Sequence, residues 1–278
     1  MPQHKHDRGL AHDLKRMESL IHRRRVLGMM AGASLVPFLG CNGSTGSADG
    51  SGSRLGSSAG SGAAGSGGSG SCSVIPEETG GPYPGDGSNG PNALTLSGIV
   101  RNDIRSSIAG LSGTAEGVPL SVQLTLVNAS DSCLSLAGYA IYLWHCDRAG
   151  NYSLYSVTDQ NYLRGVQETD DDGSVTFQTI FPACYSGRWP HIHFEIYPSL
   201  TSATTSNHKL KTSQLALPED VCRAVFSASG YEQSVDNLSR VTLASDNVFS
   251  DGADLETPRV SGSNDAGYVA NLTVAIAD

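Results

Sequence analysis

Basic side chains are scarce over most of this 278-residue chain. From Cys41 onward there are 11 Lys and Arg against 24 Asp and Glu, a formal charge of −13. A surface this acidic has little with which to neutralise phosphates, which argues against nucleic acid or an anionic membrane surface as a partner. Long apolar runs are lacking as well. The apolar stretch over residues 26–38 is shorter than the ~20 residues that a bilayer-spanning helix needs.

Cysteine motifs are also missing, because no two cysteines have the Cys-x-x-Cys spacing of a zinc knuckle. Five cysteines follow Cys41, at positions 72, 133, 146, 184 and 222. In an oxidising compartment they allow two disulfides and one free thiol, and their spacing does not say which of them pair.

Basic residues gather at the N-terminus, where residues 1–40 hold seven Lys and Arg against three acidic residues. The run RRRVL (23–27) before the apolar stretch resembles a twin-arginine export signal. FLGC (38–41) resembles a bacterial lipobox, in which Cys41 would carry a lipid anchor; the alternative is a cleaved signal with an incidental cysteine. Residues 1–41 are therefore expected to be a bacterial export signal, and the protein a cell-surface lipoprotein or a secreted protein.

Residues 42–71 are almost entirely Gly, Ser and Ala, with nothing to bury in a core. We expect a disordered linker there, with a root-mean-square reach of roughly 30 Å. A single folded domain is then expected over residues 72–278, which is long enough for one substantial core.

Alternation of apolar and polar residues predicts that this domain is all-β. In residues 120–126, for example, Leu and Val occupy every second position, as in a half-buried strand. Gly, Asn, Asp and Pro clusters separate such stretches, which favours a β-sandwich with long loops and one short helix near 218–226. Strands are expected at 94–100, 120–126, 139–146, 174–180, 191–197, 240–244 and 272–276.

The stretch RWPHIHFEIYP (188–198) contains the first candidate site. On a strand, His191 and His193 project from the same face. A single histidine is most often satisfied by local hydrogen bonds, but only four histidines follow Cys41, and two of them share this face. The pair therefore favours a metal site. No carboxylate stands at the spacing of a two-His-one-carboxylate iron site, so the other ligands must come from elsewhere.

Two tyrosines at strand-to-loop transitions, Tyr152 and Tyr185, are candidates for those ligands. A phenol with a pKa of ~10 is a poor ligand near neutral pH, but a bound cation favours the phenolate. A hard ion such as Fe(III) gains most from this oxygen donor. For each tyrosine alone, a core position with a hydrogen-bonded hydroxyl is the alternative.

Together these residues resemble the intradiol ring-cleavage dioxygenases, the catechol and protocatechuate dioxygenases that use non-haem Fe(III). Four segments in the family's order carry the resemblance: IPEETGGPYPGDG (75–87), YLWHCDRAGNYSLY (142–155), NYLRGVQETDDDGSVTFQTIFPACYSGRWPHIHFEIYP (161–198) and TSQLALPED (212–220). The specific elements are Gly-x-Tyr, Pro-x-x-Tyr and Arg-x-Pro-His-x-His.

The resemblance implies roles for individual residues. The metal ligands would be Tyr152, Tyr185, His191 and His193. Arg188 would border the substrate and offset negative charge on its ring. Gln214 would contact the site residues without binding the metal itself. Pro82 and Tyr83 would lie near the pocket wall, whereas His145 and Asp147 would be structural.

The resemblance also implies an activity: O2-dependent cleavage of a catechol between its two hydroxylated carbons, giving a cis,cis-muconate-type diacid. Larger intracellular members dimerise through an N-terminal helical region; the signal and linker stand in its place here, so dimerisation by that route is not expected. Cys146 and Cys184, beside the two tyrosine motifs, suggest an exported branch of the family that is stabilised by disulfides. Two other classes compete: a non-catalytic β-sandwich that binds a ligand or metal, and a structural zinc sandwich with core tyrosines.

Overall fold

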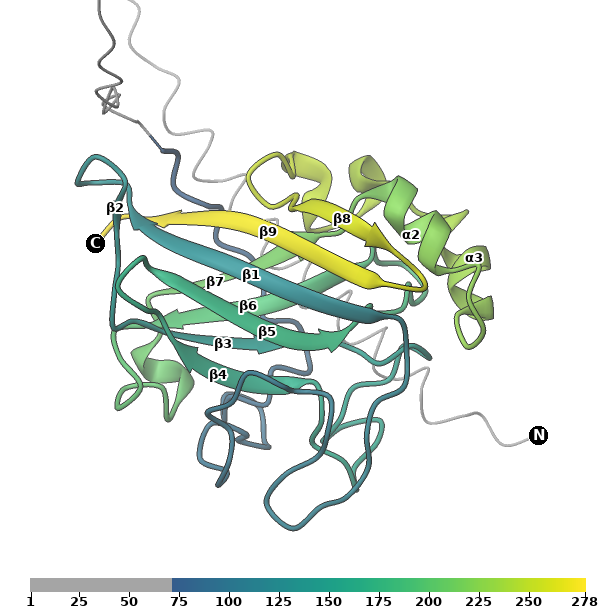
Figure 1. Cartoon of the computed structure of the whole chain (residues 1–278), viewed down its shortest axis with the longest axis horizontal. Coiled ribbons are helices and arrows are strands. Elements are labelled where there is room, and N and C mark those ends of the chain that lie inside the picture. The colour runs from purple at the N-terminus through teal and green to yellow at the C-terminus, as the bar shows by residue number, and fades with distance from the viewer. Residues whose placement is uncertain (1–71) are drawn as a thin grey trace, which may run out of the picture. The chain divides into compact units, whose positions relative to one another are not determined.

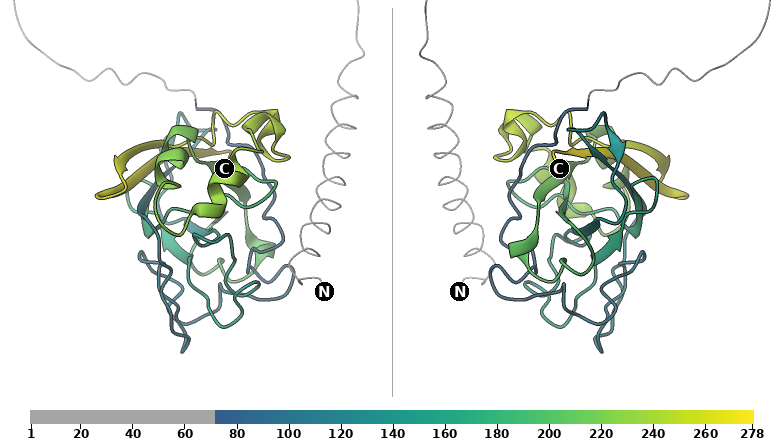
Figure 2. Two further views of the ribbon diagram at one scale, coloured as in Figure 1. Left: turned by 90° about the vertical axis from the view of Figure 1, so that its right-hand side faces the viewer. Right: turned by 90° about the vertical axis from the view of Figure 1, so that its left-hand side faces the viewer.

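The structure, a computed structural model, describes residues 72–278, and the expected signal, linker and Cys41 anchor lie outside these residues. Two β-sheets pack as the layers of a sandwich (Figure 1). One sheet has five strands in the order β2-β1-β9-β8, with β5 also paired to β1, and the other has the order β4-β3-β6-β7. Figure 2 shows the same elements from the two ends of the strands. The predicted all-β sandwich is confirmed.

The strands differ widely in length, from two residues to ten. Their bounds are β1 (Pro119–Asn128), β2 (Leu134–Ser135), β3 (Ala140–Trp144), β4 (Arg164–Glu168), β5 (Ser174–Ile180), β6 (His191–Tyr197), β7 (Lys211–Ala216), β8 (Arg259–Ser263) and β9 (Gly267–Ile276).

The five-stranded sheet is built on β1 and β9, which run parallel from Leu120 opposite Tyr268 to Asn128 opposite Ile276. The alternation in β1 predicted from the sequence is present: Leu120, Val122 and Leu124 are buried while the residues between them are exposed or half-buried. One face of this sheet therefore covers the core and the other faces solvent.

The four-stranded sheet positions the candidate site. Every residue of β3 and β6 is buried, because this sheet is covered on both faces. Strand pairing places Arg164 of β4 opposite Trp144 of β3, Trp144 opposite His193 of β6, and His193 opposite Gln214 of β7. Four residues that are far apart in the sequence thus form one row across the sheet.

Two predicted strands are wrong. Residues 94–100 form successive turns, in which the Leu96 amide bonds the Ala93 carbonyl and the Ile99 amide bonds the Leu96 carbonyl, and Gly98 has φ +87°. Residues 240–244 contain the start of a 3-10 turn, η2 (Leu243–Ser245), which the Thr242 side chain caps. In both places a local polar side chain, Asn92 or Thr242, accepts a hydrogen bond from a backbone amide of the turn, and Gly98 permits the positive φ of the first.

The prediction of a single helix is also incomplete. Helix α2 (Glu219–Val225) lies where it was expected, but a second helix, α3 (Glu232–Leu238), follows it at the same end of the sandwich (Figure 1). Only two residues of α3 are buried, so its sequence lacks a clear apolar stripe. Two further 3-10 turns are η1 (Ser206–His208) and η3 (Phe249–Asp251). Within residues 72–278, no helix has the length and apolar content to cross a membrane.

The cysteines correct another expectation. Cys72 and Cys133 form a disulfide with Cα atoms 5.9 Å apart, which ties the start of the described region to the turn after β1. Cys146, Cys184 and Cys222 are buried free thiols. Disulfides at Cys146 and Cys184, expected beside the tyrosine motifs, are therefore wrong, and one disulfide is present in the described residues rather than two.

Candidate metal centre

The two histidines stand at the start of β6, with their side chains on one face of the four-stranded sheet. Both are almost completely buried. Tyr152 lies in the turn that follows β3 and is buried, while Tyr185 lies in the loop between β5 and β6 and is half-buried. The two histidines thus belong to β6, whereas each tyrosine lies in a loop that connects two strands.

The polar atoms of these four side chains converge on one point. The Nε2 atoms of His191 and His193 are 3.1 Å apart. The Tyr152 hydroxyl lies 3.5 Å from His191 Nε2 and 3.4 Å from His193 Nε2, and the Tyr185 hydroxyl lies 3.2 Å from His191 Nε2. Two imidazoles and two phenols therefore direct their polar atoms into a space that one ion would fill.

Neighbouring groups fix the orientation of both imidazoles. His191 Nδ1 is 2.5 Å from the Trp189 carbonyl, and since a carbonyl only accepts, Nδ1 carries the proton and Nε2 presents a lone pair. The His193 ring stacks on Trp144 with an interplanar angle of 3° and centroids 4.9 Å apart. His191 therefore has the donated Nδ1–H and the free Nε2 expected of a metal-ligating histidine.

Burial opposes charge on all four side chains. It raises the pKa of Tyr152 and of Tyr185 above that of a free phenol, and for Tyr152 the proximity of Tyr185 adds to the effect. Burial also lowers the pKa of both histidines, with the positive charge of Arg188 contributing to each. The imidazoles are thus kept neutral and ready to coordinate, while the phenols require a strong cation to ionise. This donor set fits a hard, highly charged ion such as Fe(III).

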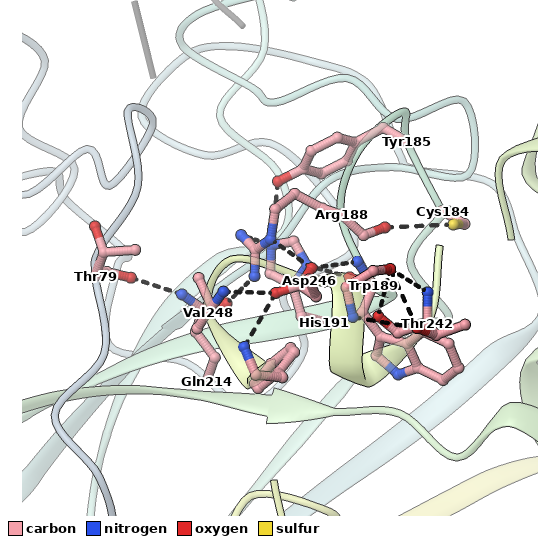
Figure 3. Close-up of polar contacts among 12 residues, drawn as sticks. Thr79, Cys184, Tyr185, Arg188, Trp189, His191, Gln214, Thr242, Asp246 and Val248 are labelled. Atoms are coloured by element: carbon pink, nitrogen blue, oxygen red, sulfur yellow. Dashed lines mark hydrogen bonds and ion pairs between the residues drawn. The ribbon is translucent and has the colours of Figure 1, made fainter. Parts of the chain in front are cut away.

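Arg188 lies beside the centre and is held by two partners. Its Nε donates to Asp246 Oδ2 over 2.9 Å and its NH2 to Gln214 Oε1 over 2.8 Å, while NH1 is 3.5 Å from His191 Nε2. Figure 3 shows the guanidinium among these side chains, below the Tyr185 ring. Gln214 in turn donates to the Thr79 carbonyl over 2.7 Å. The guanidinium is thus fixed close to the ligand atoms.

Asp246 is a site residue that the sequence analysis missed. It is fully buried, and besides Arg188 it accepts bonds from the backbone amides of Trp189, Val248 and Phe249. It sits in a turn outside every motif of the resemblance, so no local pattern identified it. An acidic residue in a turn is ordinarily exposed, and only the tertiary structure reveals its partner.

A cavity of about 540 Å³ adjoins the centre. Its lining includes three tyrosines and several polar side chains, among them Tyr83, Tyr152, Tyr185, Arg148, Glu232 and Asn237. Tyr83 packs on Tyr152 with ring centroids 5.0 Å apart, in keeping with the expectation that Tyr83 lies near the pocket wall. A cavity of this size holds ligands larger than a single aromatic ring.

The tyrosines are essential to the interpretation of this centre. In the part of the chain that the structure describes, no group of three or more His, Cys, Asp or Glu side chains could hold a metal. His145 is not directed toward the centre: its two ring nitrogens lie 2.7 Å from the Cys146 carbonyl and from Thr179 Oγ1. It is a structural residue, as expected.

Comparisons with known proteins agree with the architecture. A family model described as dioxygenase matches residues 101–228. The solved structure of an intradiol ring-cleavage dioxygenase from Tetranychus urticae is 26% identical, covers 74% of this chain and 95% of its own, and superposes with a TM-score of 0.59. The expected resemblance to the intradiol ring-cleavage dioxygenases is therefore confirmed.

More distant intradiol dioxygenases and related domains are also similar. A dioxygenase domain from Streptomyces sp. SirexAA-E is 20% identical and covers 74% of this chain and 99% of its own, with a TM-score of 0.47. A 3-chlorocatechol 1,2-dioxygenase from Rhodococcus opacus 1CP is 18% identical over 72% of each chain, with a TM-score of 0.46. A search of curated proteins finds no match.

Proposed function

We propose that this protein is a non-haem Fe(III) intradiol dioxygenase that uses O2 to cleave a catechol between its two hydroxylated carbons, giving a cis,cis-muconate-type diacid. The single observation that carries the proposal is the convergence of four polar atoms. The two imidazole Nε2 atoms are 3.1 Å apart, the Tyr152 oxygen lies within 3.5 Å of both, and the Tyr185 oxygen lies 3.2 Å from His191 Nε2. Tyr152, Tyr185, His191 and His193 would hold the ion. When bound, Fe(III) would supply the Lewis acidity that activates a catechol toward O2.

The two tyrosines would have different tasks. Tyr152 is buried and packed against Tyr83, so it would remain a fixed ligand. Tyr185 is half-buried and lines the cavity, so it is the one placed to move when a catechol enters. Its phenolate oxygen would then accept a proton from a catechol hydroxyl, which is general-base catalysis.

Arg188 would stabilise the negative charge that develops on the catechol ring. Its guanidinium is fixed by Asp246 and Gln214 before any substrate arrives, so little reorganisation accompanies the reaction. Its ion-pair partner is the fully buried Asp246 carboxylate. Arg188 would thus orient and stabilise an anionic substrate without leaving its own position.

The cavity supports a range of substituted catechols as substrates. Its volume of about 540 Å³ exceeds what an unsubstituted catechol fills, and its lining includes polar side chains such as Asn237 and Arg148. A polar substituent on the ring would find hydrogen-bond partners there.

Oxygen uptake tests the proposed function. Protein loaded with Fe(III) should consume one O2 per catechol and release a ring-opened diacid, and 4-substituted catechols should also be turned over. His193→Gln should lower kcat at least ~100-fold because it removes a ligand, whereas the matched change of the exposed His208→Gln should not. Catechol binding without O2 uptake by an iron-replete sample would instead favour the non-catalytic binding module.

We also propose that the enzyme acts outside the cytoplasm, as a cell-surface lipoprotein or a secreted protein. The RRRVL and FLGC motifs support this, and so does the Cys72–Cys133 disulfide, since disulfides persist mainly in oxidising compartments. Cell fractionation of wild type and Cys41→Ser tests it. A lipid-anchored protein should leave the membrane fraction in the variant, and a cytoplasmic wild-type protein would contradict the proposal.

A further inference from the structure

Arg164, the first residue of β4, is a fully buried cation, and the sequence analysis gave it no role. Buried arginines are ordinarily neutralised by a carboxylate, because an unpaired buried charge is costly. Among the described residues, no ion pair and no hydrogen bond joins Arg164 to a carboxylate, and all of its hydrogen-bond acceptors are neutral oxygens. A charge retained under these conditions indicates a specific role.

All five N–H donors of the guanidinium are used. Each goes to an oxygen on the turn after Tyr152, on the segment before Gly85, or on the neighbouring strand β3. The bonds are Nε to Ser153 Oγ (3.1 Å), NH1 to the Pro84 carbonyl (2.7 Å), NH1 to the Tyr142 hydroxyl (3.0 Å), NH2 to the Tyr83 carbonyl (2.9 Å) and NH2 to the Ser153 carbonyl (3.0 Å).

These bonds fix both the backbone beside Tyr152 and the segment whose tyrosine packs on the Tyr152 ring. Ser153 directly follows Tyr152, so its two bonds to Arg164 hold the peptide from which the phenol projects. The Tyr83 ring packs on the Tyr152 ring, with centroids 5.0 Å apart. One guanidinium therefore sets both the ligand's backbone and the wall against which the ligand ring rests.

Arg164 also belongs to the row of residues across the four-stranded sheet that contains the candidate histidine ligand His193. It stands opposite Trp144, and Trp144 stands opposite His193 and stacks on its ring. Arg164 is therefore also one of the set of strand residues that positions His193.

We propose that Arg164 is a positioning residue of the metal centre: its five hydrogen bonds hold the backbone beside Tyr152 and the segment that carries Tyr83, so that the Tyr152 phenol stays in coordinating geometry. This inference rests on the proposed function, because it requires that Tyr152 is a ligand. Arg164 itself touches neither the converging ligand atoms nor the cavity, so its effect passes through Ser153 and Tyr83.

The experiment compares Fe(III) affinity and the visible absorption spectrum at saturating Fe(III) for wild type, Arg164→Met and Arg164→Lys. Arg164→Met should weaken Fe(III) binding about 10–100-fold, the range found for residues that orient metal ligands, and should shift the tyrosinate-to-iron band. Arg164→Lys keeps the charge but has three donors in place of five, so it should fall between the two. Arg105→Met is the matched control, because the exposed Arg105 guanidinium pairs with Asp103 and, among the described residues, donates to nothing around Tyr152 or Arg164.

The outcomes separate this inference from the proposed function. No band in iron-replete wild type would contradict the proposed function itself. A wild-type band that is unchanged in both Arg164 variants, with unchanged Fe(III) affinity, would overturn the role of Arg164 alone. Lower thermal stability with an unchanged band and affinity would also overturn it, since that describes a merely structural residue. If Arg164→Met does not fold, Arg164→Lys decides on the same two readouts.

Discussion

Arg188 and Asp246 form a buried ion pair across 58 positions of sequence, with Arg188 Nε 2.9 Å from Asp246 Oδ2. The arginine is next to the candidate ligands, and the aspartate lies in a turn beyond η2. The same carboxylate accepts hydrogen bonds from the backbone amides of Trp189, Val248 and Phe249, so the backbone fixes the position of the Asp246 side chain. The C-terminal part of the domain, beyond β7, thereby contributes directly to the site.

Replacing Asp246 by Asn should separate catalysis from metal binding. The variant keeps the shape of the side chain but leaves the Arg188 guanidinium without its counter-charge, and the guanidinium is then free to shift from the substrate position. We expect iron content close to that of wild type and a kcat about 10–100-fold lower, within the range found when one charge-stabilising group is lost or misplaced. O2 uptake at saturating catechol, normalised to iron, measures this. The exposed Asp254→Asn is the control, and an unchanged kcat in Asp246→Asn would contradict the role given to the pair.

Stability of the metal-free protein should fall in weak acid because of His145. Burial lowers the pKa of His145 to about 4, whereas an unfolded histidine titrates near 6.5. Between these values the unfolded chain binds a proton that the folded chain lacks. The contribution to the free energy of unfolding is therefore complete above pH 6.5 and is lost as pH falls toward 4, by an amount on the order of 3 kcal/mol.

His145→Gln should flatten that pH dependence. Urea unfolding at pH 7 and at pH 5 measures it, and the difference between the two values should be smaller in the variant than in wild type. His208→Gln, at an exposed position, should keep the wild-type difference. Equal pH dependence in wild type and His145→Gln would show that His145 does not contribute.

The Cys72–Cys133 disulfide should stabilise the domain chiefly by restricting the unfolded chain. The bridged residues are separated by 61 positions, and a loop of that length corresponds to about 4 kcal/mol in the chain-entropy estimate. Cys133→Ser should lower the free energy of urea-induced unfolding by up to this amount, and reduced wild type should match the variant. If reduction leaves the wild-type midpoint unchanged, the bridge is absent or contributes nothing.

Strands with a regular pattern could be predicted from the sequence. Strands β5 and β6 have the predicted bounds, 174–180 and 191–197, because buried apolar residues recur at alternate positions in them. Strand β7 was missed, since five of its six residues are buried although Thr212, Ser213 and Gln214 are polar. Its buried positions hold polar residues, of which Gln214 bonds Arg188, and this removes the apolar periodicity on which a strand prediction depends.

The candidate ligands could be named from motifs, but their supports could not. The motif resemblance named Tyr152 and Tyr185, which spacing alone left as ordinary core tyrosines. Asp246 lies outside every quoted motif, and Thr79 lies within one that gave it no role; each acts only through a partner that is distant in the sequence. Arg164 lies within a quoted motif, yet its five acceptors come from three separate segments, so only the tertiary structure reveals what it holds.

The visible absorption spectrum of the Fe(III)-loaded protein tests the central claim most directly, because tyrosinate-to-iron charge transfer reports on the ligands themselves. Wild type should be red to burgundy, Tyr152→Phe should shift or weaken the band, and Tyr139→Phe, whose hydroxyl bonds Asp278 away from the centre, should leave it unchanged. A colourless sample that contains one iron per chain would contradict the account.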